Sequence, residues 1–276
     1  DKARAAAARY AAIAPSAAHA QHMPSHTFTR VGMWKESVDA NERSSEIALE
    51  SGSIAEALHA SDYEMYAYLQ LGDTVHAKAV LDRLPALAMK FDPKAITGAA
   101  PPLAGFFALA AIPARWALER GAWSDAAALT PKPTDYPYVE AMTYFARAIG
   151  ASHTGDVELA KASVDSLAAI QQRLTVDKEP YWSEQVAIQK LGAQAWLELA
   201  RHHNEDALRD MREAATREDR DCGNEGDNGS PLKHLTSPDS PGGSACLARC
   251  SCAVTVPQGQ RHGGKCGGNR CDDASG

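Results

Sequence analysis

The sequence predicts an all-α fold over residues 1–219, in which antiparallel helix pairs stack on one another. Strand-like alternation of apolar and polar residues is nearly absent from this part of the 276-residue chain, and strong helix formers dominate it. Apolar residues recur there at spacings of three and four. Turn-forming residues interrupt the pattern at intervals of roughly 15 to 20 residues, a length that suits paired helices.

The helices can be placed in order along the chain. Ser16, Ser53 and Asp73 supply N-caps for three of them. We expect helices near residues 2–13, 17–31, 34–50, 54–71, 74–90, 103–120, 123–129, 137–153, 156–172, 180–202 and 204–218.

A repeated turn supports the pairing. Four pairs carry a glycine at the turn and, five residues later, a small residue at which the second helix approaches the first. The glycines are Gly32, Gly72, Gly121 and Gly155, and the small residues are Ser37, Ala77, Ala126 and Ala160. A looser fifth pair has His202 in the glycine position and Ala207 in the small position. The small positions are separated by 40, 49, 34 and 47 residues, and one separation equals the 34 residues of a tetratricopeptide repeat. The pattern predicts a tetratricopeptide-like α-solenoid, with generic helical hairpins as the alternative.

Longer segments resemble a family of uncharacterised bacterial tetratricopeptide-repeat proteins. The segments are HMPSHTFTRVGMWKESVDANERS (22–44), DYEMYAYLQLGD (62–73), AAIPARWALERGAW (110–123), YWSEQVAIQKLGAQAWLELA (181–200) and ALRDMREAATRED (207–219). The resemblance covers residues 1–219. It implies a solenoid of stacked helix pairs and no enzymatic activity.

Residues 220–276 differ sharply in composition. They contain all six cysteines, 11 of the 20 glycines and no aromatic residue. We expect this tail to be disordered, because so few apolar side chains cannot offset the entropy of ordering it, or to be read in a shifted frame. Its cysteines lack the paired spacing of a zinc site, although zinc and disulfides stay open.

Two histidine-bearing stripes form the candidate binding site. Spacings of three and four put each stripe on one helical face, and the first helix of each tetratricopeptide pair lines the concave groove. We therefore expect both stripes to line that groove. The first stripe is His19, His22, His26 and Arg30, and the second is His59, Asp62, Tyr66 and Gln70.

Three interpretations of these stripes stay open. His22, His26, His59 and Asp62 suit zinc or another divalent ion. Arg30 and the histidines could instead grip a carboxylate of a peptide or chain terminus. In the third, His22 and His26 only pack a helix start that Pro24 strains. We expect an interaction scaffold whose groove holds a protein segment, a peptide or a small ligand, with a metal site as the alternative function and a purely structural scaffold as a further one.

Other function classes receive little support. The net charge of -7 disfavours nucleic-acid binding. The most apolar run, 99–114, is too short to span a membrane comfortably and contains three prolines. Common catalytic motifs are absent, and no cysteine precedes residue 220 to serve as a nucleophile, so we expect a protein that is not an enzyme. The chain begins with Asp1 and shows no signal peptide; we expect a fragment or processed product, and both a cytoplasmic and an exported location stay open.

Overall fold

The computed structural model describes residues 6–7, 9–95 and 97–224, and within these ranges the regular structure is entirely helical. The all-α prediction is therefore confirmed. The helices are α2 (Ala18–His22), α3 (Pro24–Arg30), α4 (Trp34–Glu50), α5 (Ile54–Gln70), α6 (Thr74–Lys90), α7 (Pro102–Glu119), α8 (Trp123–Ala128), α9 (Pro137–Thr154), α10 (Val157–Val176), α11 (Pro180–Ala200) and α12 (Asn204–Asn224). None of these helices is both long and apolar enough to cross a lipid bilayer.

Most predicted helices lie within a few residues of their expected positions, and the N-terminal region differs most. The helix expected over 17–31 is interrupted at Met23, because Pro24 has no backbone N–H to continue the hydrogen-bond ladder. Residues 11–13, expected to be helical, form a turn. At the other end, α12 continues to Asn224, and the rest of the predicted tail, including five of its six cysteines, lies outside the described residues.

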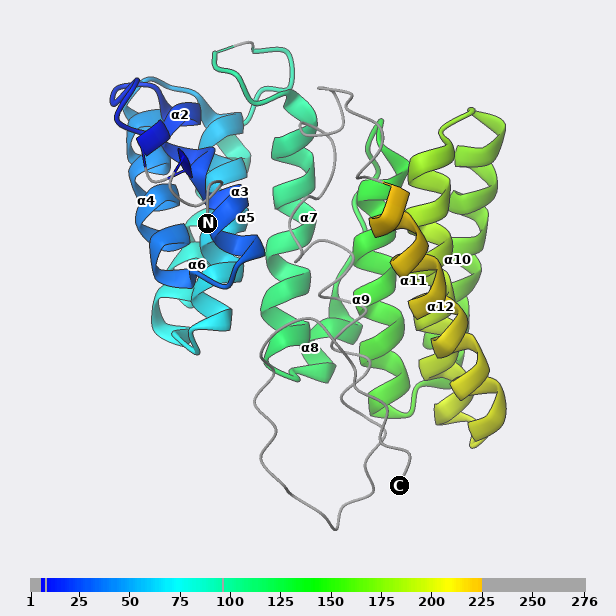
Figure 1. The fold of residues 1–276 in the computed structure, drawn as a ribbon. Helices are drawn as coiled ribbons and strands as arrows, with labels where there is room; N and C mark the ends of the chain where they lie inside the picture. The colour runs from blue at the N-terminus through cyan, green and yellow to red at the C-terminus, as the bar shows by residue number, and fades with distance from the viewer. Residues whose placement is uncertain (1–5, 8, 96, 225–276) are drawn as a thin grey trace.

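The helices pack mainly against their neighbours in sequence. Figure 1 shows them side by side in chain order, from α2–α6 at one end to α10–α12 at the other. Helices α5, α7, α9 and α11 contact one another in that order, and α4, α6, α8, α10 and α12 each pack against members of this row. This packing does not by itself establish a superhelix of the tetratricopeptide type, which stays a prediction.

The turns have the backbone geometry that the repeated glycines predict. Gly32, Gly72, Gly121 and Gly155 have φ between 63 and 80°, in the left-handed region. His202 adopts the same conformation, with φ of 65°, at the position where the fifth pair lacks a glycine. After Gly72 the amide of Asp73 donates back to the carbonyl of Tyr68 at 2.9 Å, as in a Schellman cap. Ser37, Ala77, Ala126 and Ala160 are completely buried, as close approach requires.

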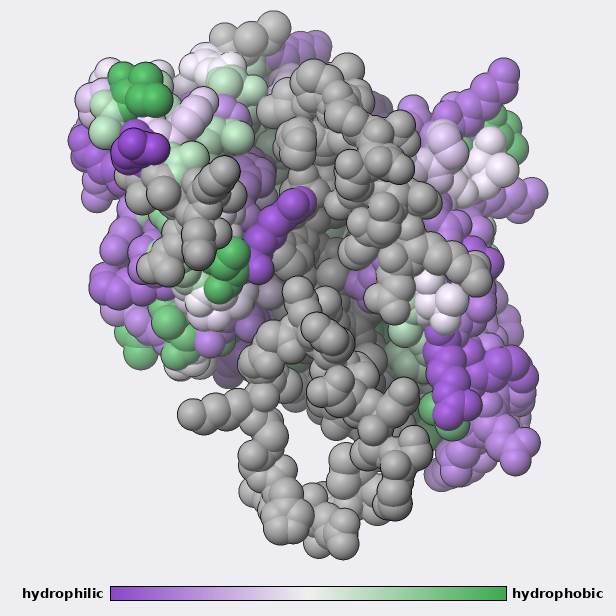
Figure 2. Space-filling model, viewed as in Figure 1, coloured by the Kyte–Doolittle hydropathy of each residue, from purple (hydrophilic) through white to green (hydrophobic). Residues whose placement is uncertain are grey.

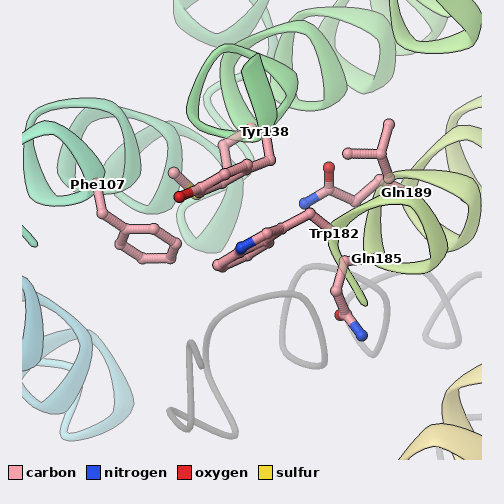
Figure 3. A pocket seen from close by; sticks show the side chains of 7 residues that line it. Phe107, Tyr138, Trp182, Gln185 and Gln189 are labelled. Carbon is pink, nitrogen blue, oxygen red and sulfur yellow. The ribbon is translucent and has the colours of Figure 1, made fainter. Parts of the chain in front are cut away.

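The core changes in character along the array. Around α9–α11 it is apolar and aromatic, with Phe145, Leu167 and Val186 almost fully buried. Tyr138 and Trp182 stack there with ring centroids 3.8 Å apart, and Phe107 faces them (Figure 3). Around α2–α5 a small apolar cluster and part of a second one, which extends to α6 and α7, are accompanied by many buried polar side chains. On the outside, the visible surface over α10 and α12 is mostly hydrophilic (Figure 2).

Candidate metal centre

Three histidines from three different helices converge in the polar N-terminal core. One ring nitrogen from each of His22, His26 and His59 lies within 4.8 Å of the other two. The Nε2 atoms of His22 and His26 are 3.0 Å apart. The ring centroids of His22 and His59 are 4.3 Å apart. The site thus combines the two stripes that the sequence separates by more than 30 residues.

The break at Met23 positions the first two histidines. His22 is the last residue of α2, and His26 lies in the first turn of α3, where Pro24 occupies the first helical position. Proline is well tolerated at that position, so α3 begins directly after the break at Met23. His22 and His26, which are four residues apart, therefore lie on the same side of the chain. His59 reaches the same point from the second turn of α5, which contacts α2 and packs extensively on α4.

The hydrogen bonds of Asn41 set the tautomer of His22. The Asn41 Nδ2 group donates to the carbonyl of Ser37 at 2.7 Å, so its Oδ1 atom is the acceptor that faces His22. The Nδ1 atom of His22 lies 2.6 Å from that oxygen and must carry the proton. The lone pair of His22 is therefore on Nε2, which faces His26. Burial first, and then the neighbouring histidines, hold the pKa of His22 well below its usual value, so the ring is neutral.

Tyr63 plays the corresponding part for His26. Its hydroxyl lies 3.1 Å from the Nδ1 atom of His26. A tyrosine hydroxyl can either donate or accept a hydrogen bond, so it can match both tautomers of the imidazole. Tyr63 lies outside the two histidine-bearing stripes of the sequence, so helical spacing does not assign it to the site. It is buried, with 4% of its surface exposed, and its hydroxyl belongs to the site.

His59 is the least constrained of the three. Its side chain makes no hydrogen bond to any other residue that the structure describes, although it is only partly exposed. Burial is the main reason why its pKa falls to about 3, with the nearby histidines His26 and His19 adding to the effect. A neutral imidazole without a hydrogen-bond partner has a lone pair available for a ligand.

His19 lies at the edge of this group. Its Nδ1 atom is 3.8 Å from the Oε1 atom of Glu56, and its ring centroid is 5.8 Å from that of His22. Glu56 in turn accepts hydrogen bonds from the amides of Ala99 and Ala100, at 2.8 and 3.3 Å, in the connection before α7. His19 and Glu56 therefore surround the three-histidine group without contributing to it.

The structure does not bring Asp62 into the group, against the predicted metal set. Its carboxylate accepts two hydrogen bonds from Arg115 of α7, at 2.9 and 3.3 Å, and 3% of its surface is exposed. Burial raises the pKa of Asp62, and the charge of Arg115 opposes that shift. The helical spacing of the stripe cannot predict that Arg115 pairs with Asp62, because Arg115 lies on another helix more than 50 residues away in the sequence.

The other predicted groove residues also lie apart from the histidines. Tyr66 is buried against Trp34 in an edge-to-face contact, and the guanidinium of Arg115 lies 5.1 Å from its ring centroid. Gln70 donates to Glu119 at 3.4 Å. Arg30 is exposed at the end of α3. The eight predicted residues therefore do not share one surface.

Two other places in the described part of the chain are weaker candidates. Glu198, His203 and Asp206 form a second group of potential ligands, but Glu198 already pairs with Arg201 at 3.0 Å. A hollow beside Phe107, Tyr138 and Trp182 (Figure 3) has a volume of about 10 Å³, which is room for one water molecule. Neither place offers neutral lone pairs that converge.

Comparison with family models, with curated protein sequences and with solved structures finds no match to this chain.

Proposed function

We propose that this protein is a metal-binding module that holds a divalent first-row transition ion, with zinc as the reference case. The ligands are Nε2 of His22, Nε2 of His26 and a ring nitrogen of His59. The observation that carries the proposal is the convergence of three imidazole nitrogens within 4.8 Å of one another. Imidazole is the common ligand for zinc, copper, nickel and iron, and it binds as the neutral ring.

The geometry of the ligands suits such an ion. In a tetrahedral zinc site with Zn–N bonds of about 2.0–2.1 Å, two ligand nitrogens lie about 3.3 Å apart. His22 and His26 already hold their Nε2 atoms 3.0 Å apart. The separation of this pair is therefore close to the one that the ion requires.

The surrounding hydrogen bonds also suit a metal centre. Metal-ligating histidines usually donate a hydrogen bond from the N–H of their second ring nitrogen to a fixed acceptor, which sets the orientation and basicity of the ring. Asn41 does this for His22, and the hydroxyl of Tyr63 can do it for His26. Without metal, His26 donates the proton on its Nε2 to His22. When the ion takes that Nε2 position, the neutral ring carries its proton on Nδ1 instead and donates it to the hydroxyl of Tyr63.

The broader prediction of a peptide-binding scaffold stays a prediction and has less support. Asp62 and Tyr66 were expected to meet the ligand, but both are buried and in contact with Arg115. The prediction that the protein is not an enzyme likewise stays a prediction.

The test is a calorimetric zinc titration of the full chain after its thiols have been alkylated. All six cysteines lie at residue 222 or beyond, so alkylation removes competing thiolates without touching the histidine group. We expect one zinc per chain. His26→Ala and His59→Ala should each weaken binding by more than roughly tenfold, because each removes one of three ligands.

Two further variants serve as matched controls. His76→Ala removes an exposed histidine that pairs with Asp73, and His203→Ala breaks the second group of potential ligands. Both should bind zinc as the parent does. Equal affinity in His26→Ala, His59→Ala and the parent would contradict the proposal, as would a loss of binding in His203→Ala alone.

A further inference from the structure

The three-histidine group contains no negative charge of its own. In the proposed metal centre, three neutral imidazoles leave the full double positive charge of a divalent ion uncompensated. His22 has 1% of its surface exposed, so water screens that charge poorly. Among the described residues, the group within 4.8 Å includes no carboxylate.

Two buried carboxylates on α5, the helix that carries His59, are already engaged. Asp62 accepts both of its short hydrogen bonds from Arg115, so its charge is neutralised in a buried pair. Glu56 accepts from the amides of Ala99 and Ala100 and faces the outer side of His19. Moving either carboxylate to the metal would leave buried donors without a partner, which is costly.

His19 is the other side chain that could complete the coordination sphere. Its Nδ1 atom faces Glu56, and none of its ring nitrogens lies within 4.8 Å of all three ligand nitrogens. His26 and His59, by contrast, are partly exposed, which places this side of the group toward the surface.

We propose that the metal keeps its fourth position for a small external anion, hydroxide in water or a carboxylate when one is supplied; this anion site rests on the proposed metal centre. Zinc sites with three protein ligands characteristically bind water or a substrate in the fourth position. Here an anion in that position also supplies the missing negative charge. The site is then a receptor for a small carboxylate anion, with the metal as the group that recognises it.

The experiment uses the full, thiol-alkylated chain loaded with Co²⁺ in a chloride-free, non-coordinating buffer. Tetrahedral Co²⁺ has visible d–d bands that respond to each of its ligands. Sodium azide and sodium acetate are then added separately. We expect saturable shifts of the bands with both anions, and the same shifts in His19→Ala, because His19 is not a ligand.

Three outcomes would overturn the inference, and they identify what failed. Bands that form but do not change with either anion show a metal centre whose fourth position is closed. Bands that change in His19→Ala before any anion is added show that His19 is the fourth ligand. The absence of d–d bands in the parent, together with no zinc heat, removes the metal centre itself and not only its anion.

Discussion

The two ends of the helix array bury different kinds of side chain. Around α9–α11 the buried residues are mostly apolar, such as Phe145, Ile149 and Leu167. Around α2–α5 apolar residues such as Leu58 and Met65 are buried too, but a chain of polar contacts runs through the interior beside them. It links Thr29 to Ser37 at 3.1 Å, Ser37 to Asn41 at 2.7 Å and Asn41 to His22 at 2.6 Å.

The difference shows that helix packing of this kind does not itself require a polar interior. The C-terminal helices pack through the same turns and small residues with an apolar core. A buried polar group destabilises the fold unless it is fully hydrogen-bonded, so a connected network is a feature that needs its own explanation. In the N-terminal region the network ends on the three histidines, which is where the proposed ligand binds.

The largest expected effect on the polar N-terminal region comes from a substitution at Arg115. This arginine has 1% of its surface exposed and neutralises Asp62. Arg115→Met should destabilise the protein by about 3–5 kcal/mol at pH 7, because it leaves a buried carboxylate without its partner. Urea unfolding measures the effect. The loss should shrink toward pH 4, since the unpaired Asp62 then becomes protonated.

Phe145→Ala is the matched change in the apolar region. It should destabilise by about 3–5 kcal/mol through loss of contacts and a cavity. No titratable group is unpaired by this change, so the loss should be nearly the same at both pH values. If Arg115→Met also showed no pH dependence, the pair with Asp62 would not be the reason for its effect.

Parts of the fold were open to prediction because they depend on local sequence. Helix existence follows from apolar spacing, and the positive φ at Gly72 and even at His202 follows from the alignment of turns. The helix start at Asp73 is confirmed by its hydrogen bond to the amide of His76, whereas Ser53, expected in the same role, makes no such cap.

The site was only partly open to prediction, for a physical reason. Helical spacing indicates which histidines share a face, and it brought His22, His26 and His59 into one hypothesis. It cannot show which distant side chain competes for a carboxylate, so Asp62 was assigned to the metal and not to Arg115. One feature of the sequence does point to Asn41. It is a polar residue one turn after the close-approach residue Ser37, at a position where an apolar residue is usual.

Glu64 is a second buried charge of the N-terminal region and offers a further test of the difference between the two ends of the helix array. It pairs with Arg83, and its other oxygen, Oε1, has no hydrogen-bond partner among the described residues. Burial is the main reason why its pKa rises from 4.5 to about 7. Protonation of Glu64 therefore stabilises the folded protein fully below about pH 4.5, and this stabilisation is lost as the pH rises through 7.

Glu64→Gln removes this titration, so the variant should gain stability relative to the parent as the pH rises from 4.5 to 8, by about 3 kcal/mol. Unfolding midpoints of both proteins over that range measure the difference, and all other titrating groups cancel. Asp165→Asn, which alters an exposed pair with Lys161 on α10, is the control and should show no such trend. A constant offset between Glu64→Gln and the parent would show that Glu64 does not titrate in this range.

The smallest expected effect tests what the two regions share. His202 has φ of 65°, a conformation that is unfavourable for a residue with a Cβ atom, and Gly72 has φ of 72° at the equivalent N-terminal turn. His202→Gly should stabilise the protein by about 0.5 kcal/mol, since relief of backbone strain slightly exceeds the entropy that glycine adds to the unfolded chain. Gly72→Ala should destabilise it by about 1 kcal/mol through the backbone alone, because a Cβ atom there meets nothing within 4 Å. Thermal unfolding of both variants should show shifts of opposite sign. Shifts of opposite sign would show that the two regions share the same kind of turn and differ only in their interiors. Shifts of the same sign would mean that the two turns are not equivalent.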